Sequence, residues 1–102
     1  MDHSGCCHCP QRKKERSPEE YKKLIHRLNR IEGQIRGIRG MVESDAYCPD
    51  ILVQAAAVNA AVNAFSKELL AAHIRTCVAD DIRAGKDETI DELVTTLRKL
   101  MK

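Results

Sequence analysis

The feature that most constrains this chain is a stretch at positions 50–84 that contains neither glycine nor proline. Within it, apolar residues recur at alternating steps of four and three positions: Ile51, Ala55, Val58, Val62, Phe65, Leu69 and Ala72. This spacing is typical of a helix that packs along a seam against another helix. The sequence therefore predicts one long helix that needs a partner.

Cys48, His73 and Cys77 are soft metal ligands at the two ends of this predicted helix. His73 and Cys77 are four positions apart, so their side chains share one helix face. Cys48 precedes His73 by 25 positions, which is roughly 38 Å along a helix. One chain therefore cannot bring all three together. Two antiparallel copies about a two-fold axis can, and we expect an obligate oligomer with metal sites between subunits.

The chemistry of these residues leaves two interpretations open. Two thiolates and an imidazole favour Cu(I) or Zn(II) over Mg or Ca, and three ligands suit trigonal Cu(I). Buried free cysteines are also common and inert, so His73 and Cys77 could equally be an ordinary pair at a helix end. The spacing alone does not decide between them.

The composition predicts a small core. The chain has 102 residues, no Trp, and only Phe65, Tyr21 and Tyr47 as aromatic residues, so oligomerisation is the expected source of further buried surface. Its five cysteines fit reduced thiols or metal ligands better than a disulfide framework. No segment approaches the ~18 apolar residues of a membrane span, and the N-terminus does not resemble a signal peptide. We expect a cytoplasmic protein with no membrane partner.

The chain is expected to consist of a flexible tail at residues 1–16 and a single domain at residues 17–102. The tail is basic, contains Cys and His, and shows no apolar periodicity. No strand pattern occurs in the domain. The expected fold is therefore all-α.

Three helices are predicted in this domain. Ser17 and Pro18 have the form of an N-cap and a first helical position, and an apolar stripe continues to about Glu43. The long helix follows a turn at residues 44–47, and Gly85 suits its C-terminal end. A short third helix with its own apolar stripe begins near Asp87.

Positive charge is concentrated in the first helix and its approach. Residues 11–39 hold ten Lys or Arg against four Glu, a balance of +6 on a chain whose net charge is +2. Gly33, Gly37 and Gly40 fall opposite the apolar stripe, and glycine costs a helix about 1 kcal/mol relative to Ala, so we expect DNA or another subunit to approach closely there. A merely solvated charged face is the alternative. The expected DNA-binding residues are Arg27, Arg30 and Arg36, with Lys23 and Arg39 on the flanks.

Three segments resemble one known family. They are RLNRIEGQIRGI at residues 27–38 followed by MVE at 41–43, YCPDILVQ at 47–54, and the run from His73 to Cys77 and Val78. Together they resemble the copper-sensing repressor family CsoR, the Cu(I) branch of the CsoR/RcnR group. The resemblance covers residues 20–100.

This resemblance implies an antiparallel dimer that assembles into a dimer of dimers, binds operator DNA when metal-free and releases it on binding Cu(I). It implies that Cys48 of one subunit and His73 and Cys77 of the other are the Cu(I) ligands. Tyr47 and Glu92 match the family's pair that hydrogen-bonds the non-coordinating nitrogen of the histidine.

The second thiolate favours the copper branch of the group. Nickel and cobalt sensors of the group have a histidine at the position of Cys77, and persulfide sensors lack the histidine at position 73. The tail departs from the usual family pattern, because its cysteines and histidine could bind a further soft metal or pass copper to the main site. These accessory candidates are Cys6, Cys7, His8 and Cys9.

The sequence thus predicts a Cu(I)-responsive repressor of copper efflux or resistance genes, with operator DNA and other copies of itself as partners. A copper chaperone is a further partner compatible with this function. One alternative is a copper-buffering or chaperone module, which the tail cysteines favour. Another is a thiol- or persulfide-responsive repressor of the same fold. No nucleophile, base and orienting group converge, so we expect no enzyme.

Overall fold

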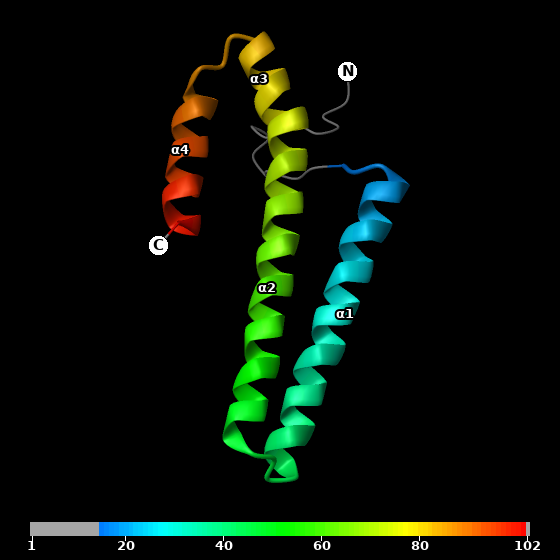
Figure 1. Ribbon diagram of the computed structural model, residues 1–102. Helices are drawn as coiled ribbons and strands as arrows, with labels where there is room; N and C mark the ends of the chain where they lie inside the picture. Colours follow the sequence, from blue (N-terminus) through cyan, green and yellow to red (C-terminus); the bar gives the residue numbers. More distant parts are fainter. Residues whose placement is uncertain (1–14, 102) are drawn as a thin grey trace. The chain divides into compact units, whose positions relative to one another are not determined.

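The computed structural model describes residues 15–101, which are all-helical apart from their turns (Figure 1). Helix α1 covers Pro18–Glu43 and α2 covers Cys48–His73. A π-helical turn, η1, covers Ile74–Val78 and leads directly into α3, Ala79–Arg83. Helix α4 covers Glu88–Leu100. The described residues contain no strand, and the all-helical prediction is confirmed.

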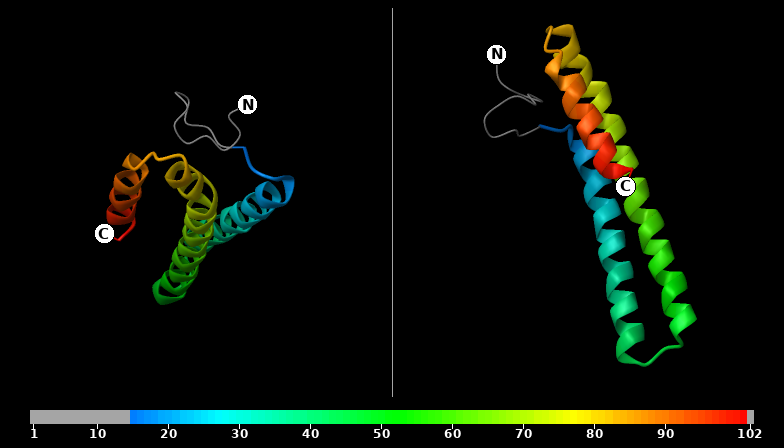
Figure 2. Two further views of the ribbon diagram at one scale, coloured as in Figure 1. Left: turned by 90° about the horizontal axis from the view of Figure 1, so that it is seen from above. Right: turned by 90° about the vertical axis from the view of Figure 1, so that its left-hand side faces the viewer.

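The described residues fall into two compact units, Ser17–Leu69 and the part from Leu70 onward. In the first unit, α1 and α2 as far as Leu69 run antiparallel, joined by the turn at residues 44–47 (Figure 2). In the second unit, α4 packs against η1. The predicted tail lies almost entirely outside the described residues, so the boundary between tail and domain stays a prediction.

The start of α1 follows the predicted cap. Ser17 has an extended backbone, and its side-chain oxygen accepts a hydrogen bond from the backbone N–H of Glu20 at 3.1 Å. Pro18 occupies the first helical position, where the N–H that it lacks would have no partner in the helix. Local sequence alone is therefore sufficient to set this helix start.

The predicted long helix is not α-helical throughout. Helical structure is continuous from Cys48 to Arg83, but at η1 the backbone N–H of Ala79 donates to the carbonyl of Ile74, five residues back. The hydroxyl of Thr76 donates to the carbonyl of Ala72 at 2.8 Å. Single π-turns of this kind within α-helices are rare and frequently lie at functional sites.

Two helices end in the same hydrogen-bonded motif. After α3, Gly85 has φ +80°, its N–H donates to Ile82, and the N–H of Lys86 donates to the carbonyl of Asp81. After α1, Asp45 has φ +59°, and the equivalent bonds reach Val42 and Met41. These are Schellman motifs, in which one residue adopts a left-handed conformation.

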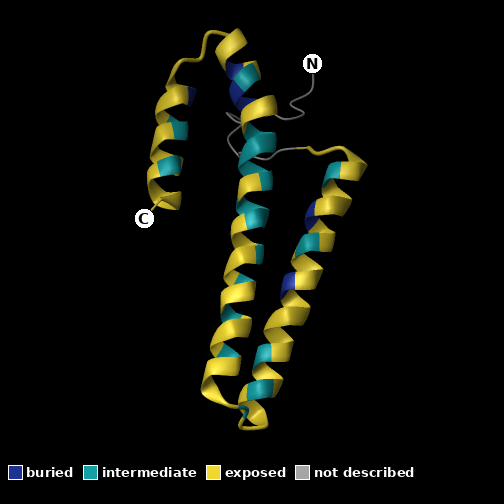
Figure 3. Cartoon of the chain, viewed as in Figure 1, coloured by how far each residue is buried: buried dark blue, intermediate teal, exposed yellow. Residues whose placement is uncertain are grey.

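One protomer buries little apolar surface. Within residues 15–101, the buried apolar side chains are Leu24, Ile31, Cys77 and Val78. Most of α1 and α4 is exposed (Figure 3). The apolar stripe expected on the third helix includes Ile90, Val94 and Leu100, each at least 40% exposed. Exposed apolar stripes of this extent mark surfaces that another molecule covers.

None of the described helices has the combination of length and apolar character needed to cross a membrane.

The two left-handed positions predict opposite effects on stability. Gly85→Ala is expected to lower the free energy of unfolding by about 1 kcal/mol, because a Cβ disfavours the left-handed conformation. Asp45→Gly is expected to raise it by up to about 1 kcal/mol, because it removes a Cβ from such a position. Urea unfolding followed by circular dichroism, at one protein concentration, measures both. Destabilisation by Asp45→Gly would show that its side chain makes a contact that outweighs the backbone cost.

Candidate functional site

Cys48 and Tyr47 stand at the start of α2. Cys48 is its first residue and is an exposed free cysteine. Tyr47 is 74% exposed, and its carbonyl accepts the backbone N–H groups of Asp50 and Ile51 at 3.0 and 3.3 Å. The thiol and the phenol are therefore both available to another molecule at this helix end.

His73 and Cys77 stand where α2 gives way to η1. His73 is the last residue of α2 and is half-buried. Cys77 lies inside the π-turn and is only 1% exposed. It is disulfide-bonded in this structure. Because the thiolate is the form that binds metals, Cys77 can serve as a ligand only after reduction.

His73 and Glu92 come together in the second unit. Both line an open pocket of about 400 Å³, whose other lining residues are Asp91, Thr95 and Thr96. Packing of α4 against η1 produces this arrangement. The family resemblance had pointed to Glu92, whereas Asp91 was not predicted.

The three predicted ligands do not gather in one protomer. Cys48 begins α2 and His73 ends it, so the helix itself keeps them apart. No group of three or more His, Cys, Asp or Glu side chains suited to a metal forms within residues 15–101. Cys6, Cys7, His8 and Cys9 lie outside the described residues.

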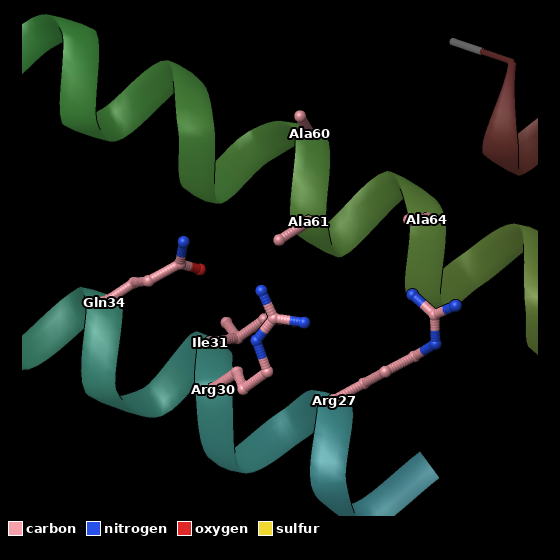
Figure 4. A pocket seen from close by; sticks show the side chains of 7 residues that line it. All are labelled: Arg27, Arg30, Ile31, Gln34, Ala60, Ala61 and Ala64. Carbon is pink, nitrogen blue, oxygen red and sulfur yellow. The ribbon is translucent and has the colours of Figure 1, made fainter. Parts of the chain in front are cut away.

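The predicted DNA-binding residues divide into two groups. Arg27 and Arg30 extend from α1 toward α2 (Figure 4) and help line a pocket of about 310 Å³ with Ile31, Gln34, Ala60, Ala61 and Ala64. A nitrogen of Arg27 lies 3.9 Å from Glu68, and both side chains are about 40% exposed. An exposed ion pair at this distance is weak, so Glu68 holds Arg27 only loosely.

The remaining predicted residues lie on exposed parts of α1. Arg36 is exposed and flanks Gly33, and Arg39 pairs with Glu43 at 3.3 Å. Lys23 lies at an open hollow of about 480 Å³ with Tyr21, Lys22, Ile25, His26 and Asn29. This hollow combines cations with an aromatic ring and was not predicted.

The glycine face, formed by Gly33, Gly37 and Gly40, is open in the protomer. A Cβ added at Gly37 or Gly40 would meet no atom within 4 Å, and at Gly33 it would meet only the end of Arg36 at 3.9 Å. Packing within one chain therefore does not explain these glycines.

Comparison with known proteins identifies the family. Residues 20–99 match a family model described as metal-sensitive transcriptional repressor. This chain belongs to the metal-sensitive transcriptional repressors. The prediction of a regulator that is not an enzyme is confirmed by this membership. Repressors act on DNA, which agrees with the positive charge of α1.

Named repressors of this family are similar to the chain over most of its length. It is 48% identical over 88 residues to the copper-sensing transcriptional repressor CsoR of Bacillus subtilis (strain 168), covering 85% of this chain and 87% of that protein. It is 44% identical over 59 residues to the copper-sensing transcriptional repressor RicR of Mycobacterium tuberculosis (strain ATCC 25618 / H37Rv), covering 58% of this chain and 62% of that one.

Two solved structures share the fold. The copper-sensing repressor CsoR with Cu(I) from Geobacillus thermodenitrificans NG80-2 matches with a TM-score of 0.84 and 42% identity, covering 88% of this chain and 95% of that chain. The nickel-responsive transcriptional regulator InrS matches with a TM-score of 0.70 and 33% identity, covering 85% and 96%. The expected resemblance to the copper-sensing repressors is confirmed.

The glycine face gives a direct test of what meets α1 in solution. Gly37→Ala is expected to raise the free energy of unfolding by about 1 kcal/mol, because alanine favours the helix and its methyl group enters open space. Thermal and urea unfolding measure the change. A loss of stability would instead show that a second copy packs against this face, whereas the expected rise in stability together with weaker DNA binding would place DNA there.

Proposed function

We propose that this chain is a Cu(I)-responsive transcriptional repressor that binds operator DNA when metal-free and is released by Cu(I), which derepresses copper efflux or resistance genes. The observation that carries the proposal is the pair of His73 and buried Cys77 around the π-turn, on a chain 48% identical to a copper-sensing repressor. We infer a cytoplasmic location, because DNA and reduced thiols are found together there.

The donor chemistry fits Cu(I) after reduction. Bound Cu(I) supplies a soft centre of low coordination number, which two thiolates and an imidazole satisfy. Burial shields Cys77 from water, while His73 stands at the edge of the open pocket. The exposed thiol of Cys48 is available to a second chain.

We infer that each metal site is shared between two protomers. Cys48 of one protomer joins His73 and Cys77 of the other, because α2 holds Cys48 and His73 at opposite ends of one helix. Tyr47 and Glu92 orient the imidazole through its second nitrogen. The exposed apolar stripes of α1 and α4 support the antiparallel dimer and its assembly into a dimer of dimers.

DNA binding is assigned to the cations of α1. Arg30 and Arg36, with Arg27, Lys23 and Arg39, would contact phosphates across the assembly, which fixes position on the duplex. An effector can shift DNA binding only by the difference in its affinity for the DNA-bound and released states. Residues that couple metal binding to a change elsewhere in the fold are therefore as important for DNA release as the ligands.

An electrophoretic mobility shift on DNA upstream of the protein's own gene, under anaerobic reduction, tests this function. We expect the metal-free protein to bind and Cu(I) to release it. Arg36→Ala is expected to weaken DNA binding and leave copper binding unchanged. Because one phosphate contact is lost, the plot of log DNA affinity against log salt concentration should become less steep by about 0.9. Lys99→Ala, an exposed cation in the last turn of α4, is the matched control.

Other outcomes of this assay identify the alternatives. A metal-free protein that does not bind DNA would favour a copper-buffering or chaperone module. Release by polysulfide, with no release by Cu(I), would favour the thiol-responsive repressor.

A mixed dimer tests the sharing of ligands. Cys48→Ala and His73→Ala are each expected to lose tight Cu(I) binding, whereas a heterodimer of the two variants regains one complete site of its two. The intact site pairs Cys48 of one chain with His73 and Cys77 of the other. Competition with a Cu(I) chelator measures the stoichiometry, with the unmixed variants as controls. A heterodimer without tight copper would rule out ligands shared in this way.

A further inference from the structure

Asp81 and Thr89 form a buried polar contact between α3 and α4. The hydroxyl of Thr89 donates to a carboxylate oxygen of Asp81 at 2.8 Å. Asp81 is 8% exposed and Thr89 3%, and within residues 15–101 they are the two buried polar or charged residues. An aspartate is rarely buried without partners, and a hydrogen bond to a carboxylate is among the stronger kinds. The hydrogen bond between Asp81 and Thr89 is therefore a specific contact of the folded protein.

The same aspartate also closes α3. Its backbone carbonyl accepts the N–H of Lys86 at 2.8 Å, beside the bond from Gly85 to Ile82 at 3.0 Å. Asp81 thus ends one helix with its backbone and holds the next with its side chain. One residue thus takes part in both the end of α3 and the attachment of α4, and only the second of these contacts uses its side chain.

The contact lies between the proposed metal ligand and the proposed orienting residue. Asp81 follows Cys77 by four positions, and both are buried. Thr89 precedes Glu92 by three positions, which is one turn of α4. Glu92 in turn lines the pocket that His73 enters, and α4 packs against η1, which contains Cys77. Asp81 therefore lies about one helical turn from Cys77, and Thr89 about one turn from Glu92.

We propose that Asp81 and Thr89 are positioning residues for the copper response. Their hydrogen bond holds α4 so that Glu92 faces His73, and a change at His73 and Cys77 is passed to α4 and then to the DNA-binding assembly. Neither residue contacts the metal or DNA. This inference rests on the proposed function, because it concerns how that function is coupled.

Two matched pairs of variants test the proposal. Thr89→Val and Asp81→Leu remove the hydrogen bond, whereas Thr89→Ser and Asp81→Asn keep a hydroxyl donor and an oxygen acceptor. For each reduced full-length protein, three quantities are measured: Cu(I) affinity, DNA affinity without copper, and DNA affinity with copper. Couplings between sites typically change affinity by roughly 5- to 150-fold.

We expect Thr89→Val and Asp81→Leu to keep Cu(I) affinity and metal-free DNA affinity within about twofold of the parent, while copper changes their DNA affinity by about twofold or less. Thr89→Ser and Asp81→Asn are expected to behave as the parent. A purely structural role would instead lower all three quantities together with stability. Full copper release of DNA by Thr89→Val, or loss of its copper binding, would overturn the proposal.

A measurement on the parent keeps the test independent of variant folding. Amide hydrogen exchange of the metal-free and Cu(I)-bound protein is expected to differ in α4, because that helix receives the signal. Unchanged exchange throughout α4 would overturn the proposal. Failure of the proposed function is recognised separately, because the parent itself would then not bind DNA or would not be released by Cu(I).

Discussion

The continuous helical structure from Cys48 to Arg83 is the constraint on which the rest of the molecule depends. A helix spaces its residues by a fixed rise, so a thiol at the start of α2 and an imidazole at its end cannot meet by bending of the chain. The same helix exposes apolar residues that one protomer leaves uncovered. Under the proposed function, metal binding and association of chains depend on the same surface, because the proposed ligands stand at the two ends of the helix that needs a partner.

Local sequence was sufficient for most of the fold. Ser17 and Pro18 predicted the start of α1, the apolar spacing from Ile51 predicted the long helix, and Gly85 predicted its end. Each of these signals acts through contacts with residues within one or two helical turns. For the candidate site, the helical spacing of His73 and Cys77 and the family resemblance point to the same residues, and their role as ligands stays a prediction.

The remaining features depend on contacts or backbone states that the spacing of residues does not encode. Nothing in the spacing of residues in η1 distinguishes a π-turn from an α-helix, since the two differ in which carbonyl each backbone N–H reaches. Asp45 takes a left-handed conformation more typical of glycine. Thr89 could not be paired with Asp81 without knowing how the corner at Gly85 folds. Arg27 was expected to contact DNA, and its spacing gave no sign that it lies 3.9 Å from Glu68 on the neighbouring helix.

The π-turn changes how the sequence maps onto the helix surface. A turn closed by bonds five residues long accommodates one more residue than an α-turn, and one residue corresponds to about 100° around a helix axis. The side chains of Ala79–Arg83 are therefore rotated around the helix axis relative to the positions that the spacing from Ile51 to Ala72 would give them. Residues after the turn face directions that a helical wheel drawn from the earlier seam assigns wrongly. The chain thus acquires a second, rotated helix face without a loop, and the buried Asp81 lies on it.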